Sequence, residues 1–201
     1  SDESRGLGDV YKRQTHNCAV GSYTLQANTT NYQTAIGAYA LNATTTGANN
    51  TGVGFYALLS NTTGENNVAV GAYALDASTT APRNTAIGAF ALSAATTGEQ
   101  NVAIGQATLQ LLTTGNNNTV VGQTAAYNLT TGANNTAVGR GAMYDGSSSY
   151  NVAVGLNALY NTAADYNTAV GYQAGQASST GTNNSSFGYN AQPSNTNNSN
   201  E

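Results

Sequence analysis

The chain has 201 residues but only five Lys or Arg and nine Asp or Glu, and its formal net charge is −4. It contains no Trp, one Met, three Phe and 23 Gly, a composition that excludes an ordinary globular core of large apolar side chains. The absence of a basic patch excludes electrostatic nucleic-acid binding, and no apolar run is long enough for a membrane-spanning helix.

Residues 1–14 hold six of the charged residues, which sum to zero. The stretch from Asp9 to Gln14 matches the translation of a transposon end that is used to prepare sequencing libraries. We interpret residues 1–14 as an adapter-derived artefact, with a disordered charged tail as the alternative. Neither interpretation gives this segment a function.

Residues 15–190 contain an internal repeat. Its marker is the glycine that closes a tripeptide such as Ala-Val-Gly or Ala-Ile-Gly, and the spacing of this glycine is 16 or 17 residues. The marker glycines are Gly21, Gly37, Gly54, Gly71, Gly88, Gly105, Gly122, Gly139, Gly155, Gly171 and Gly188. A fixed period of this kind is typical of a solenoid. We therefore predict an all-β, parallel β-solenoid (β-roll) of about eleven coils of 16–17 residues.

The three residues before each marker glycine predict a strand. Val or Ile directly precedes the glycine in nearly every repeat, and Thr or Val stands two residues earlier, so these two columns share one strand face. A row of small residues, mostly Ala, lies between them and faces the other way. We expect each coil to bury a Val or Ile, a Leu and some Ala, which is too little for one coil to be stable alone, so the coils must stack.

The remainder of each repeat is harder to assign. An Ala-Leu pair follows the glycine, and it predicts either a second short strand or a single helical turn. Thr-Thr-Gly is expected to form the turn, with its Gly supplying a positive φ.

An Asn column lies four residues before the marker glycines. When coils stack at about 4.8 Å, identical amide side chains lie one above another and can exchange hydrogen bonds. We interpret this column as a structural ladder rather than a polar binding stripe. Its central members are Asn50, Asn67, Asn84, Asn101, Asn118 and Asn135.

The row of small residues bears on assembly. Small side chains in register permit close approach of another backbone, which favours several chains around one axis, and we prefer a homotrimer. The alternative is a single-chain coil in which the Ala row lines a tight corner.

The run Asn-Thr-Ala-Val-Gly, with trailing Ala-Leu and Thr-Thr-Gly, resembles repeats of trimeric autotransporter adhesin heads and of phage tail fibres. It is seen at Asn135 to Gly139 and, with Gly52 in place of Ala, at Asn50 to Gly64. The resemblance implies a left-handed parallel β-roll or a related trimeric solenoid that is extracellular, on a cell surface or a virion, and serves attachment. Adhesin head repeats are usually shorter and lack the regular Ala-Leu column. The Asn- and Ser-rich segment 191–201 is expected to be a disordered linker or a truncation point.

The inventory of catalytic side chains is nearly empty, so we expect neither an enzyme nor a cofactor or metal site. His16 is the only histidine. Cys18, the only cysteine, falls in the Thr/Val column and is expected to be a small buried side chain.

Two binding hypotheses remain. Aromatic residues recur two positions after the marker glycine in the N-terminal half and then stop. They are Tyr23, Tyr39, Tyr56, Tyr73 and Phe90. They either cover the edge of the coils or form a stripe that binds a carbohydrate or a cell-surface receptor. Alternatively, ladders of Thr could bind ice, which requires an exposed strand that bears Thr at fixed spacing.

Overall fold

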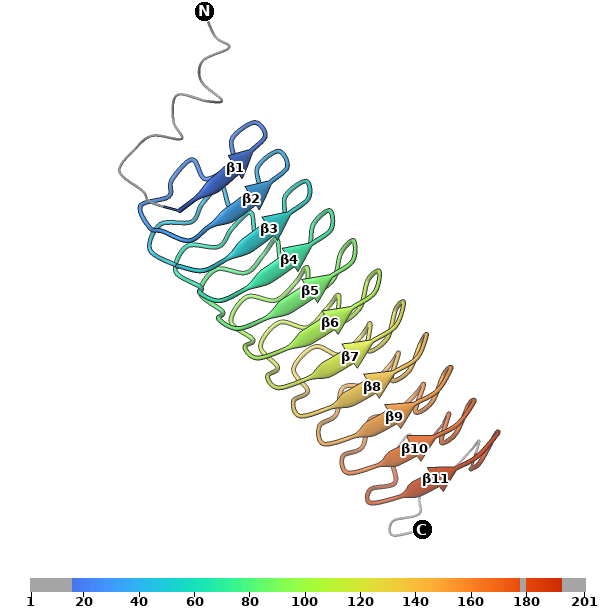
Figure 1. The fold of residues 1–201 in the computed structure, drawn as a ribbon. Coiled ribbons are helices and arrows are strands. Elements are labelled where there is room, and N and C mark those ends of the chain that lie inside the picture. The colour runs from blue at the N-terminus through green and yellow to red at the C-terminus, as the bar shows by residue number, and fades with distance from the viewer. Residues whose placement is uncertain (1–15, 178–179, 193–201) are drawn as a thin grey trace, which may run out of the picture.

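The computed structural model describes residues 16–177 and 180–192, which form a rod of stacked coils (Figure 1). The interpretations of residues 1–14 and of most of segment 191–201 concern residues outside these ranges. In the described part, eleven three-residue strands form one parallel sheet in sequence order. These strands are β1 (Cys18–Val20), β2 (Thr34–Ile36), β3 (Thr51–Val53), β4 (Val68–Val70), β5 (Thr85–Ile87), β6 (Val102–Ile104), β7 (Thr119–Val121), β8 (Thr136–Val138), β9 (Val152–Val154), β10 (Thr168–Val170) and β11 (Ser185–Phe187).

The register of the sheet follows the repeat without a slip. In the pair β4–β5, for example, Val68 lies opposite Thr85, Ala69 opposite Ala86 and Val70 opposite Ile87. Each coil therefore places equivalent residues directly above one another. The predicted parallel β-solenoid is confirmed.

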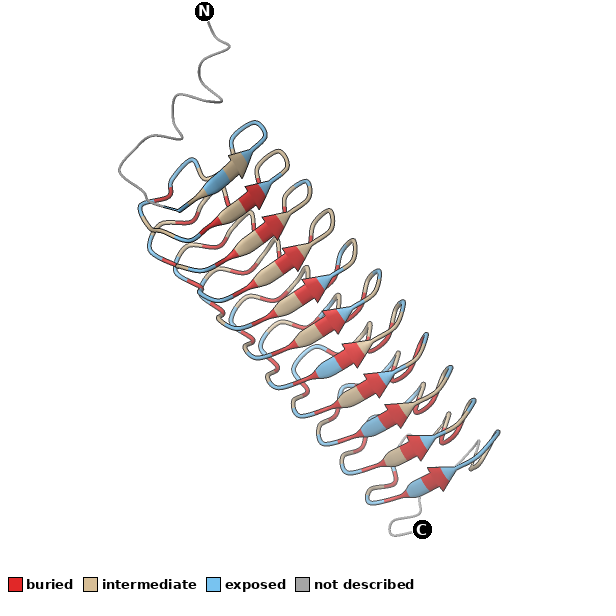
Figure 2. Cartoon of the chain, viewed as in Figure 1, coloured by how far each residue is buried: buried red, intermediate tan, exposed pale blue. Residues whose placement is uncertain are grey.

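The orientation of the strands is the reverse of the one expected. The Ala row points into the coil and is fully buried from Ala35 to Ala169, whereas Val and Ile face outward, with Ile36 40% exposed and Val138 38% exposed (Figure 2). The interior leaves little room beside this row. A Cβ added at Gly52 would lie only 3.2 Å from Cγ of Leu41 in the preceding coil. The expectation that the Ala row faces another chain is therefore wrong.

The core runs along the rod as stacked columns of small and leucine side chains. Ala57 and Leu58, or Ala74 and Leu75, are each completely buried, and their equivalents repeat in most coils. Burial of a leucine contributes about 1.5–3 kcal/mol, so each coil gains most from the leucine of its Ala-Leu pair. In the coil of β7 the sizes are exchanged, because Val120 replaces Ala and Ala126 replaces Leu, and both are fully buried.

The Ala-Leu pair lies in neither a strand nor a helix, so that expectation is also wrong; the described residues contain no helix. The chain instead turns through left-handed residues at alternate positions, such as Tyr39 (φ 60°) and Leu41 (φ 51°). This conformation costs about 1–2 kcal/mol for a residue with a Cβ. Backbone hydrogen bonds to the next coil offset the cost, as from Leu41 N to Ala57 O at 3.0 Å.

The glycine of Thr-Thr-Gly has a different role from the one expected. The positive φ falls two residues later, on Asn49 (58°) or Asn66 (59°), and not on the glycine. At Gly64 an added Cβ would lie 2.5 Å from the carbonyl oxygen of Ala81. Adjacent coils approach each other closely here, so the position takes a small residue, which is Gly in most coils but Ala81 or Ser148 in others.

Candidate functional site

The aromatic residues singled out from the sequence lie in one column on the turn side of the coils. Tyr23 and Tyr39 stack with ring centroids 4.8 Å apart, and Tyr73 stacks on Phe90 at 5.1 Å. Tyr56 is tilted against Tyr39 at 5.1 Å and meets Tyr73 edge-on at 5.4 Å. The structure thus brings all five rings together as a continuous ridge along the N-terminal coils.

A second aromatic column was missed in the sequence. Tyr127 stacks on Tyr144 at 5.4 Å, and Tyr144 stacks on Tyr160 at 5.0 Å with nearly parallel rings. These tyrosines stand five residues after the marker glycine, and their spacing of 17 and 16 residues would have revealed them. The second column begins on coils where the first one has ended.

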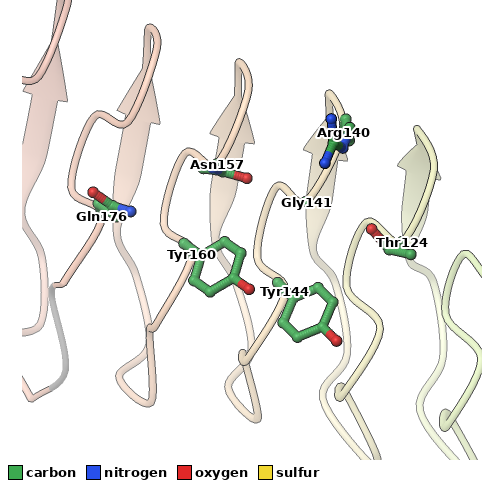
Figure 3. A pocket seen from close by; sticks show the side chains of 7 residues that line it. All are labelled: Thr124, Arg140, Gly141, Tyr144, Asn157, Tyr160 and Gln176. Atoms are coloured by element: carbon green, nitrogen blue, oxygen red, sulfur yellow. The ribbon is translucent and has the colours of Figure 1, made fainter.

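A shallow depression of about 280 Å³ lies beside this second column. Gly141 occupies the position that Tyr or Phe fills in the N-terminal coils, and Thr124 and Asn157 hold the same position in the two adjacent coils. Figure 3 shows the rings of Tyr144 and Tyr160 side by side on neighbouring coils, with Arg140 and Asn157 across the gap. Thr124 and Gln176 close the two ends along the rod.

The polar side chains of the depression are available to a ligand. Those of Arg140, Asn157 and Gln176 make no hydrogen bond or ion pair with any described residue. Arg83, by contrast, binds Glu99 at 2.8 Å. The pKa of Tyr160 is raised by burial and further by repulsion from Tyr144 and Asp145, so its hydroxyl stays protonated at neutral pH.

The Asn column lies inside the coils and is almost completely buried. The side-chain oxygen of Asn50 accepts the backbone N–H of Asn67 at 2.9 Å, and that of Asn67 accepts from Asn84 at 2.8 Å. The same bond continues through Asn101, Asn118 and Asn135. The side-chain NH2 groups mainly donate to the turn in the next coil, as from Asn50 to Gly64 O at 2.9 Å. Each Asn side chain therefore links the backbone just before a strand in the next coil to the carbonyl group of a turn in that coil.

The outward face of the sheet is a further candidate surface. Strands β2 to β10 present Thr or Val and then Val or Ile on this face. The Val/Ile row is partly exposed, to 38% at Ile87 and 37% at Val170, and less at Val53, Val70, Val121 and Val154. Cys18 belongs to the same face and is exposed, which corrects the expectation that it is buried.

Within the described ranges, no three His, Cys, Asp or Glu side chains cluster in a way that could hold a metal ion. His16 stacks on Tyr32 at 5.2 Å. No helix of membrane-crossing length and hydropathy occurs in the part of the chain that the structure describes. Comparisons of the chain with protein-family models, with curated protein sequences and with solved structures found no match.

Proposed function

We propose that this chain is a structural and adhesive segment of an extracellular fibre, in which three copies associate lengthwise through the outward face of the sheet. The observation that carries the proposal is the row of partly exposed Val and Ile side chains, which repeats on successive coils along the rod. A continuous apolar strip of this kind marks an interaction surface in soluble proteins.

The chemistry of the strip fits a second copy of the same chain. The strands β1 to β11 contain no Asp, Glu, Lys or Arg, so two such faces can meet without desolvating a charge. Because the strip runs parallel to the rod axis, chains that pair through it lie side by side in register. A trimer agrees with the resemblance to adhesin heads and tail fibres. The Ala row no longer supports it, since that row fills the coil interior.

In this proposal the turn side of each coil points away from the shared axis. The aromatic columns and the depression at Gly141 lie on turns, so they remain accessible and would provide the adhesive surface. The segment would act outside a cell or on a virion, with a cell-surface receptor or carbohydrate as its partner. It would need no cofactor and would catalyse no reaction.

Charge substitution on the strip tests the proposal. Ile87→Lys with Ile104→Lys should dissociate the assembly, because buried lysines in an apolar contact are unpaired. The matched control is Thr97→Lys with Thr114→Lys, at exposed positions of the Thr-Thr-Gly turns. Sedimentation velocity should show slower sedimentation for the first pair only, while circular dichroism stays the same. Equal sedimentation of both pairs would contradict the proposal.

The same face favours ice binding as a second candidate. The Thr pairs noted in the turns are not needed for it, because the outward face itself carries Thr. These residues are Thr34, Thr51, Thr85, Thr119, Thr136 and Thr168, interrupted by Val68, Val102 and Val152. Ice binding requires this face to be free, whereas the trimer covers it. A monomeric chain with thermal hysteresis would support ice binding, and a trimer without hysteresis would exclude it.

A further inference from the structure

The depression at Gly141 differs from the rest of the turn surface in its chemistry. In the N-terminal coils the equivalent position carries an aromatic ring, and the rings form an unbroken ridge. The ridge ends at Phe90, and the equivalent positions of the later coils, Ala107, Thr124, Gly141 and Asn157, carry no ring. The recess at Gly141 is lined by two phenol rings, a guanidinium group and two carboxamides. A recess that combines ring surface with hydrogen-bonding groups is suited to a polyhydroxylated ligand.

Arg140 adds a preference for negative charge. Among residues 16–177 and 180–192, Arg83 and Arg140 are the two Lys or Arg residues, and Arg83 is neutralised by Glu99. Arg140 is left without an acidic partner at the rim of the recess. The guanidinium group binds a carboxylate through two parallel hydrogen bonds, which fixes both its position and its orientation.

Asp145, the acidic residue closest to Arg140 along the sequence, makes no ion pair with it. Asp145 follows Tyr144 and lies outside the lining of the recess. Its carboxylate accepts a hydrogen bond from the Asn128 side chain. The negative charge of Asp145 also contributes to the raised pKa of Tyr160. An anionic group is therefore favoured at the Arg140 side of the recess and disfavoured at the tyrosine side.

We propose that this recess binds a saccharide that carries a carboxylate, such as a uronic or sialic acid unit. The carboxylate lies against Arg140. Asn157 and Gln176 bind hydroxyl groups, and Tyr144 and Tyr160 provide ring edges and protonated phenols. This inference rests on the proposed adhesive function and names the ligand of its exposed side.

Two substitutions test the site, and each has a matched control. Arg140→Gln removes the charge and is matched by Arg83→Gln, which breaks only an exposed ion pair of small energetic value. Gly141→Tyr fills the recess. Its backbone, with φ 64°, resembles that of Tyr73 (φ 58°) and Phe90 (φ 60°), so the coil can accept the ring. An added Cβ lies 2.5 Å from the Asn157 side-chain oxygen, which is the movable end of a flexible group. Its matched control is Ala107→Tyr, at the same position of an earlier coil with φ 56°.

The probes are oligogalacturonate and sialyllactose, with cellotetraose and lactose as neutral counterparts and inorganic phosphate as a competitor. The unmodified chain should bind the acidic probes, and Arg140→Gln should weaken this binding about tenfold or more because a charge-assisted hydrogen bond is lost. Gly141→Tyr should abolish binding, while Arg83→Gln and Ala107→Tyr should leave it unchanged.

Three results would overturn the inference: no binding of the acidic probes, equal binding of neutral and acidic probes, or displacement by phosphate at the same concentration as by the sugars. None of them alters the sedimentation of the assembly. Failure of the saccharide site can therefore be distinguished from failure of the fibre proposal.

Discussion

At the scale of single residues, the coils are held by polar groups as much as by apolar ones. The buried Asn side chains satisfy backbone donors and acceptors that the turns would otherwise leave unpaired, as Asn84 does for Asn101 N at 2.9 Å and Gly98 O at 2.8 Å. An unsatisfied buried polar group costs about 1–3 kcal/mol. The Asn column therefore allows such short strands to be joined by tight, buried turns.

Burial is unfavourable for the charged form of Asp76. Its carboxyl is half-buried, and one of its oxygens has no hydrogen-bond partner. Burial raises its pKa above 3.8, although hydrogen bonds from the Asp76 and Ala77 backbone oppose the shift. The folded chain therefore keeps this proton to a higher pH than the unfolded chain does.

This raised pKa predicts how stability depends on pH. As pH rises from 3.8 through the folded-state pKa, the contribution of Asp76 to the free energy of unfolding decreases. The side chain of Asp76→Asn does not ionise, so the free energy of unfolding of this variant should exceed that of the unmodified chain at pH 7. The difference should disappear at acidic pH, where Asp76 is protonated. Thermal unfolding of both proteins across this pH interval checks the prediction. An advantage that is independent of pH would contradict it.

At the scale of the element, the strand and its register could be predicted from the sequence, but its orientation could not. The β-branched columns and the constant spacing specify a parallel stack. Both faces of each strand are uncharged, however, so polarity did not show that Ala69 points inward and Val70 outward. The size of the interior decides the orientation, and it depends on where the Leu side chains lie.

The turns were predicted least well, for a physical reason. Tyr and Leu seldom adopt positive φ, so the Tyr and Leu columns that follow the marker glycines did not indicate a left-handed backbone conformation. Gly141 stands at the position of Tyr and Gly175 at the position of Leu, with φ of 64° and 57°. These two glycines were the sequence feature that could have indicated positive φ. For the same reason the recess at Gly141 was not recognised, although one of the two long aromatic columns was.

The inward orientation of the Ala row can be tested directly. Ala103→Val should lower the free energy of unfolding by about 1–3 kcal/mol, because the interior has no space for two more methyl groups. The matched control is Thr85→Val on the outward face, where Val68 and Val102 already occur, and its effect should stay within about 0.5 kcal/mol. Denaturant unfolding measures both. If Ala103→Val were harmless and Thr85→Val harmful, the assignment of the two faces would be wrong.

At the scale of the whole molecule, stability and assembly both arise from repetition. One coil buries too little apolar surface to fold alone, so its neighbours must cover its core. The same repetition aligns the outward Val and Ile side chains into a strip that a single chain leaves in water. Association through this strip would cover apolar surface along the whole rod and leave the turns, with their tyrosines and Arg140, facing the surroundings.

The native mass of the chain in solution, measured by light scattering, tests this account most directly. Association of three copies predicts three times the 20.4 kDa of one chain, at all concentrations well above the dissociation constant. A mass of 20.4 kDa under these conditions would contradict it, since the outward face would then be free in water.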